Sequence, residues 1–102
     1  MTPLYTWAGR YCAFIRNGWI FDRHSHYLGW LTEDGKAWER DGSFLGELVD
    51  ENYILRRTAM AIPARRAVRP SPARPATPAA RVNRAGRVSR AGRIDALEEL
   101  LS

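Results

Sequence analysis

A pattern with a period of 16 or 17 residues repeats through the N-terminal part of the chain. A pair of apolar or aromatic residues recurs four times, as Leu4-Tyr5, Ile20-Phe21, Ala37-Trp38 and Ile54-Leu55. Seven residues after the first member of each pair come Tyr11, Tyr27, Phe44 and Ala61. A small residue follows two positions later in the first three copies, as Ala13, Gly29 and Gly46. Since one such unit cannot bury its apolar face alone, the copies are predicted to pack around a shared core.

Each copy is predicted to be a β-hairpin. Turn residues recur with the same period, first as Gly9, Ser25 and Gly42, and then as Asn17-Gly18, Asp34-Gly35 and Glu51-Asn52. Asn-Gly and Asp-Gly supply the positive φ angles of tight hairpin turns. The segments between the turns are short and rich in aromatic and β-branched residues, which favours strands. Alternation predicts that Tyr27, Gly29 and Leu31 face one way, and that Leu28 and Trp30 face the other.

The small residues in the middle of these strands indicate that the copies approach each other closely. Hairpins arranged radially leave only short edges exposed. We therefore predict an all-β fold of four short hairpin units around a pseudo-four-fold axis, forming a domain at residues 1–62. Copies lie at 4–18, 19–35 and 36–52, and a degenerate fourth lies at 53–62.

These copies resemble the four-fold β-flower domain of bacterial proteins, whose petals read aromatic–Asp–x–x–Gly–x–apolar–Gly–Trp–x–x–Gly. The pattern fits best at residues 20–35, around Tyr27-Leu28-Gly29-Trp30. Ser25 and His26 replace the usual glycine, and Glu47 replaces the tryptophan of the third copy. The resemblance implies the four-petal fold and a tail rich in proline and basic residues, but no particular activity.

A basic segment, residues 63–93, follows the repeats. It contains nine arginines and no acidic residue, whereas residues 1–62 contain seven basic residues and eight acidic ones. Its prolines and its lack of large apolar residues predict an extended, disordered linker. Clustered arginines favour phosphate contacts, and we expect this segment to bind nucleic acid or another polyanion. The residues concerned are Arg65, Arg66, Arg69, Arg74, Arg81, Arg84, Arg87, Arg90 and Arg93. The alternative is a solvated linker whose arginines reflect a compositional bias.

The last residues, 94–102, are predicted to form a short amphipathic helix. Its apolar positions Ile94, Leu97, Leu100 and Leu101 share one face. At the end of a linker, such a helix could dock in a groove of a partner protein, and the chain would then be a protein–protein adaptor with the linker as a tether. The same pattern also fits a frayed end or a helix that packs back on its own domain.

Little in the sequence indicates catalysis. No nucleophile–base constellation, phosphate-binding loop or dinucleotide fingerprint is present, so we expect a non-catalytic scaffold without a cofactor. His24 and His26 could ligate a metal only with a further ligand, and a solvated turn is favoured instead. Cys12 is expected to be a buried apolar residue. The four tryptophans are expected to fill the core rather than form a partner surface.

The sequence has no apolar stretch long enough to cross a membrane and no signal-peptide pattern at its start. We therefore expect a cytoplasmic protein that does not insert into membranes.

Overall fold

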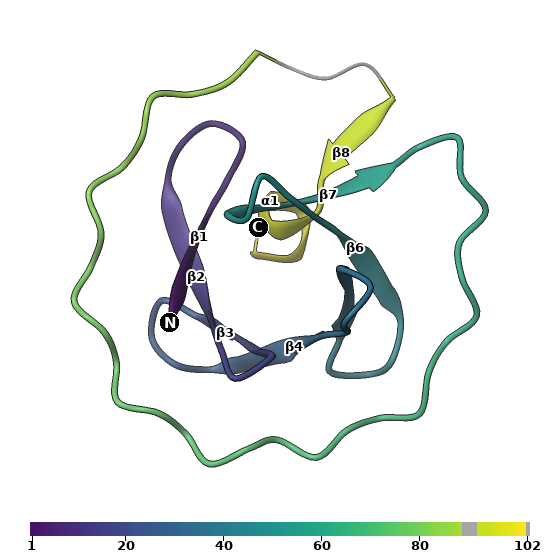
Figure 1. The fold of residues 1–102 in the computed structure, drawn as a ribbon, viewed down its shortest axis with the longest axis horizontal. Helices are drawn as coiled ribbons and strands as arrows, with labels where there is room; N and C mark the ends of the chain where they lie inside the picture. Colours follow the sequence, from purple (N-terminus) through teal and green to yellow (C-terminus); the bar gives the residue numbers. More distant parts are fainter. Residues whose placement is uncertain (89–91, 102) are drawn as a thin grey trace.

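Eight antiparallel strands form one curled sheet in the computed structural model, which describes residues 1–88 and 92–101. The strands are β1 (Thr2–Tyr5), β2 (Tyr11–Arg16), β3 (Trp19–Asp22), β4 (Tyr27–Leu31), β5 (Lys36–Glu39), β6 (Phe44–Val49), β7 (Tyr53–Arg57) and β8 (Arg93–Asp95). Each strand pairs with its neighbours in chain order (Figure 1). A short helix, α1 (Ala96–Leu101), follows β8. The predicted all-β class is confirmed.

Three hairpins, β1–β2, β3–β4 and β5–β6, share one pairing register. Their equivalent cross-strand pairs are Leu4 with Ala13, Ile20 with Gly29, and Ala37 with Gly46. Immediately after each of these pairs the register shifts by a β-bulge. The small partner is required for close packing, because a Cβ on Gly29 would lie 1.8 Å from the carbonyl oxygen of Trp38 on β5.

The bulge corrects the predicted faces of β4. Tyr27 packs in the same aromatic cluster as Trp30, whereas Leu28 and Leu31 pack together against the aliphatic core. Strict alternation is therefore wrong for this strand. A bulge adds one residue on one strand, and every side chain before it changes face relative to the simple period of two.

The fourth hairpin is formed by strands that lie far apart in the sequence. β7 pairs with β8, with Leu55 opposite Asp95 and Arg57 opposite Arg93. The prediction that residues 53–62 form the fourth unit by themselves is wrong, because residues 58–62 form no strand. The prediction of a helix from residue 94 also needs correction: residues 93–95 are a strand, and the helix begins at Ala96.

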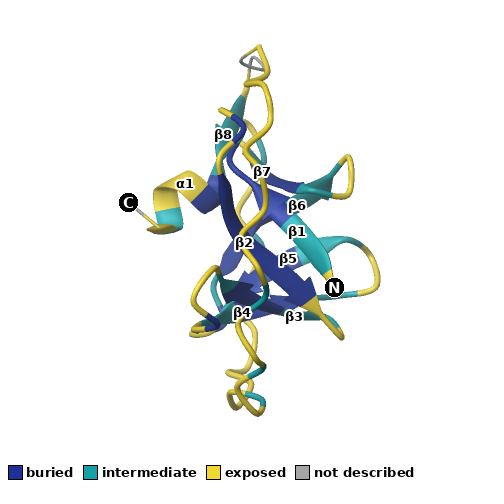
Figure 2. Cartoon of the chain, turned by 90° about the vertical axis from the view of Figure 1, so that its left-hand side faces the viewer, coloured by how far each residue is buried: buried dark blue, intermediate teal, exposed yellow. Residues whose placement is uncertain are grey.

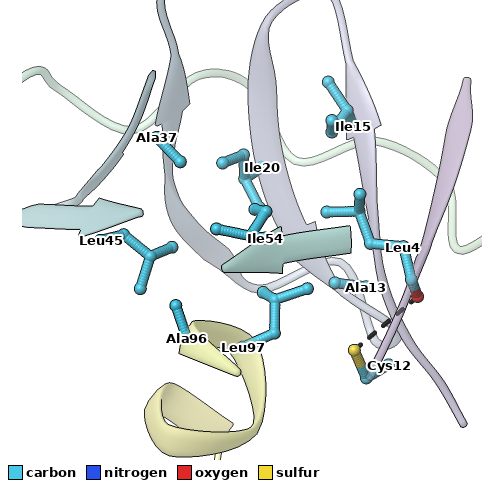
Figure 3. Packing of buried hydrophobic residues seen from close by; sticks show 10 residues of the cluster. All are labelled: Leu4, Cys12, Ala13, Ile15, Ile20, Ala37, Leu45, Ile54, Ala96 and Leu97. Carbon is cyan, nitrogen blue, oxygen red and sulfur yellow. Dashed lines mark hydrogen bonds between the residues drawn. The ribbon is translucent and has the colours of Figure 1, made fainter. Parts of the chain in front are cut away.

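The aliphatic core lies on the inner side of the curled sheet. Leu4, Ile20, Ala37 and Ile54, which lead the four copies of the repeat, are all fully buried in one cluster. Ala96 and Leu97 at the start of α1 belong to the same cluster and point toward Leu45 and Ile54 (Figure 3). The C-terminal residues therefore complete the core.

Cys12 is buried as expected, 6% exposed, and its Sγ donates to the carbonyl oxygen of Leu4 at 3.7 Å. Burial, with a smaller contribution from Asp95, raises the pKa of the Cys12 thiol from its ordinary value of 9.0 to about 12.

We expect Leu97→Ala to lower the free energy of unfolding by about 2–5 kcal/mol, since it empties a fully buried site. The matched control is Leu101→Ala on the same helix, where the side chain is 37% exposed and the loss should stay within about 0.5 kcal/mol. Urea unfolding of both variants measures the difference. Equal losses would contradict the packing of α1 against the sheet.

The Cys12 thiol should make stability fall in alkaline solution. Because the pKa of Cys12 is raised in the folded state, its contribution is complete below the pKa of the unfolded chain and is lost as the pH rises toward about 12. Urea unfolding between about pH 7 and about pH 10.5 should show a steeper decline for the unmodified protein than for Cys12→Ala. Parallel declines would show that Cys12 ionises as readily in the folded state as in the unfolded chain.

Candidate nucleic-acid interface

The outer side of the sheet, opposite the aliphatic core, carries aromatic side chains. One cluster contains Tyr5, Tyr11 and Tyr53, and another contains Trp30, Trp38 and Phe44. Trp7 packs against the first cluster, and Trp19 and Tyr27 pack against the second. We call this side the outer face. The expectation that tryptophans fill a core is met by Trp30 and Trp38, which are 1% and 2% exposed.

Residues 63–88, which we call the arm, run around the outer face. The arm leaves the sheet after β7 and returns to β8, which pairs with β7, so that it passes around the whole outline of the molecule (Figure 1). It contains no helix or strand, in agreement with the predicted extended linker, and most of its residues are exposed (Figure 2). It makes specific contacts with the sheet, and the predicted disorder is not confirmed.

Four arginines of the arm lie over aromatic rings of the outer face. The guanidinium carbon of Arg66 is 4.5 Å from the ring centroid of Trp38, and that of Arg69 is 4.9 Å from Trp30. The corresponding distances are 4.3 Å from Arg84 to Tyr5, 5.0 Å from Arg87 to Trp7 and 4.6 Å from Arg87 to Tyr53. Each such contact contributes about 0.5–1 kcal/mol at an exposed site.

Hydrogen bonds fix the arm at the same turn of three hairpins. The backbone N–H of Arg66 donates to the carbonyl of Gly42 at 2.8 Å, and that of Arg84 donates to Gly9 at 2.7 Å. At the equivalent turn of β3–β4, the hydroxyls of Ser25 and Thr77 are 3.1 Å apart. The arm therefore contacts the three positions Gly9, Ser25 and Gly42 in reverse order along the chain.

The approach of the arm to Gly42 leaves no room for a side chain. Gly42 has a φ of +89°, and a Cβ built there would lie 1.9 Å from the carbonyl oxygen of Arg66. Gly35 also has a positive φ, +81°, but a Cβ there would meet no atom within 4 Å. The two glycines separate the cost of the backbone conformation from the cost of contact with the arm.

Polar contacts involve further arginines of the predicted set. Arg65 pairs with Asp41 at 3.2 Å, and Arg87 pairs with Asp50 at 2.6 Å. Arg74 donates to the carbonyl of His24 at 2.9 Å. Arg81 is exposed and lowers the pKa of the Tyr11 hydroxyl electrostatically, although burial has the larger effect and raises it. Arg93 belongs to β8, and Arg90 lies outside the described residues.

The residues proposed for docking to a partner protein are mostly engaged within the fold. Ile94 is part of β8, Leu97 is fully buried, and Leu100 packs against the aliphatic core. Only Leu101 is classed as exposed among these four. Of the interpretations of this segment, a helix that packs back on its own domain is the one that the structure describes.

The two histidines lie on an exposed turn beside Asp22. The ring of His26 is 3.1 Å from a carboxylate oxygen of Asp22, whose other oxygen accepts from the backbone N–H groups of His24 and His26. Burial raises the pKa of the Asp22 carboxyl, but these hydrogen bonds outweigh it and hold the pKa below its usual value. Among residues 1–88 and 92–101, no group of three or more His, Cys, Asp or Glu side chains is arranged to hold a metal ion.

The partners of the arginines were not anticipated from the sequence. The basic segment has no aromatic residues of its own, and nothing in its spacing identifies Trp30, Trp38 or Tyr5 as a contact. The available signal was the recurrence of turn residues at Gly9, Ser25 and Gly42, which proved to be the contact points of the arm.

Together these features define a class: a small curled antiparallel sheet surrounded by its own arginine-rich segment. The family model described as "4-fold beta flower protein" matches residues 2–100, so the chain belongs to the 4-fold beta flower family. The match extends beyond the repeats at 4–62 to include the arm, β8 and most of α1. No curated protein and no solved structure matches the chain significantly. No helix in the described part of the chain is long and apolar enough to span a membrane.

We expect Gly42→Ala to loosen the arm and to speed tryptic cleavage at the Arg66–Ala67 bond by about five- to thirtyfold, the effect of about 1–2 kcal/mol. Gly35→Ala strains the backbone similarly without touching the arm, and should leave this cleavage rate nearly unchanged. Mass spectrometry of timed digests measures both. Equal acceleration in the two variants would mean that the contact at Gly42 does not hold the arm.

Proposed function

We propose that the protein is a non-catalytic interaction protein that binds nucleic acid or another polyanion through the arm, with the sheet as a rigid support. The observation that carries this proposal is the stacking of Arg66, Arg69, Arg84 and Arg87 over aromatic rings. A stacked guanidinium uses its flat face for the ring and keeps N–H donors at its edge, where a phosphate can accept them.

Fixing the arginines before binding favours affinity. A free arm would lose backbone and side-chain entropy when it bound a strand. Here the hydrogen bonds at Gly9, Ser25 and Gly42 already restrict the arm, and the ion pairs engage only part of its charge. A belt of cations around the molecule favours a ligand whose phosphates follow one another along a chain.

We further infer that the sheet contains four equivalent units around one axis, with the fourth completed by β8. The leading residues Leu4, Ile20, Ala37 and Ile54 share one buried cluster, and three hairpins share one register. Since Leu55 pairs with Asp95, continuation of that register would bring Ala96 opposite Ile54, in the place of the small residue Ala13 of the first unit. This arrangement would make the arm a long connection within the fourth unit.

The adaptor hypothesis has weaker support. Docking through the predicted face of α1 would require the helix to leave the core, because Leu97 is fully buried and Leu100 packs against the same cluster. A partner could reach Leu101 without such a change, but one leucine offers little apolar area.

The proposal predicts salt-dependent binding of a labelled single-stranded oligonucleotide, measured by fluorescence anisotropy over a salt series. Substituting Arg66, Arg69 and Arg84 together by Gln should reduce the slope of log affinity against log salt by about 0.7 for each arginine that contacts a phosphate. Substituting the exposed sheet residues Arg10, Arg16 and Arg23 by Gln removes the same charge and should change the slope much less.

A variant without the arm provides a second test. The N–H of Thr58 donates to the carbonyl of Gly92, so a two-residue Asn-Gly turn between these residues can join β7 to β8 directly. This variant should keep the sheet by circular dichroism and lose oligonucleotide binding. Binding that persists without the arm, or that is absent from the full chain at low salt, would refute the proposed function.

A further inference from the structure

The arm spans the hairpin turns with unequal lengths of chain. From its contact with Gly42 at Arg66 to its contact with Ser25 at Thr77 it uses 11 residues, whereas it reaches Gly9 from Thr77 with Arg84, after only 7. The hairpins that it passes have the same register, so the distances to be covered are similar. The additional chain in the first span stands away from the sheet.

A cleft of about 530 Å³ lies under this longer span. It is bounded by the arm on one side and by the β3–β4 turn and the end of β5 on the other. Its lining residues are Phe21, Ser25, His26, Tyr27, Arg40, Val68, Arg69, Pro70, Ser71 and Arg74. The set contains three arginines and no carboxylate, so the cleft favours an anion.

The three arginines enter the cleft from separately fixed positions. Arg69 is held over the ring of Trp30, and Arg74 donates to the carbonyl of His24. Arg40 follows β5, where its backbone N–H donates to Leu28 at 2.8 Å. In the part of the chain that the structure describes, none of the three forms an ion pair with a carboxylate. Guanidinium groups that converge in this way match the tetrahedral oxygens of a phosphate.

An aromatic surface accompanies the positive charge. Tyr27 is half-buried beside the cleft, and its hydroxyl donates to the backbone carbonyl of Arg69 at a long 3.5 Å. Phe21 forms part of the floor, packed against Phe14 with ring centroids 5.3 Å apart. A tyrosine ring that is fixed in this way offers a face on which a planar heterocycle can stack.

We propose that this cleft binds a nucleotide, with its phosphate between Arg40, Arg69 and Arg74 and its base against Tyr27. The volume lies within the range of small-molecule pockets and exceeds the need of a bare phosphate. The same chemistry is offered by a free nucleoside monophosphate and by one unit of a single strand. The site does not depend on the proposed function, because Arg40 lies outside the arm and a free nucleotide needs no contact with the rest of it.

Calorimetric titration of the full chain with adenosine monophosphate, inorganic phosphate and a short single-stranded oligonucleotide tests this assignment. Arg40→Ala should weaken nucleotide binding at least about tenfold, as expected for loss of one charge-assisted contact. Tyr27→Leu should weaken adenosine monophosphate by about fivefold or more and leave phosphate unaffected. Arg10→Ala, at an exposed turn outside the cleft, is the matched control and should change neither.

The outcomes separate the sources and the two proposals. If adenosine monophosphate binds and depends on Arg40 and Tyr27, the site accepts a free nucleotide. If only the oligonucleotide shows that dependence, the ligand is a unit of a strand. If inorganic phosphate binds as tightly as adenosine monophosphate, or if no ligand depends on Arg40, the nucleotide site is refuted. Strand binding that is lost with the arm arginines but unchanged in Arg40→Ala would refute the cleft and leave the proposed function intact.

Discussion

The pairing of β7 with β8 is the interaction on which the rest of this structure depends. It joins segments separated by the whole arm, and therefore carries a loop-closure cost of about 3 kcal/mol beyond that of a minimal loop. Burial of Ala96 and Leu97 in the aliphatic core offsets this cost, since two apolar side chains leave water as the strand docks. The same pairing holds both ends of the basic segment, so an arm that would otherwise be a free tail becomes a closed connection around the sheet.

Closure changes what the arginines can do. On a free tail, nine cations would act mainly through their summed charge, and each would be ordered only on binding. Around the sheet, Arg66, Arg69, Arg84 and Arg87 are placed over aromatic rings, and Arg65 and Arg87 also pair with carboxylates. The arginines also shield an aromatic surface that would otherwise be an exposed apolar patch. The arm and the outer face therefore depend on each other, and a ligand that displaced the arm would have to replace these contacts.

Much of the sheet could be read from the sequence because hairpin information is local. The Asn17-Gly18 turn, the positive φ of Gly35 and the small residues opposite Leu4 and Ile20 all follow from patterns within about 17 residues. The β-bulges were missed, since a bulge is one additional residue and alternation alone cannot reveal it. The face of Tyr27 was therefore assigned wrongly.

By itself, the sequence determined the class of fold, the repeat, the buried Cys12 and the concentration of positive charge in one segment. Only the tertiary structure decided that β8 completes the sheet, that α1 packs into the core and that the arm lies on the aromatic face. The physical reason is that these contacts join residues 36 or more positions apart, such as Arg57 with Arg93 and Arg69 with Trp30. Their free energy depends on surfaces that exist only after the local hairpins have assembled, so no periodicity along the chain encodes them.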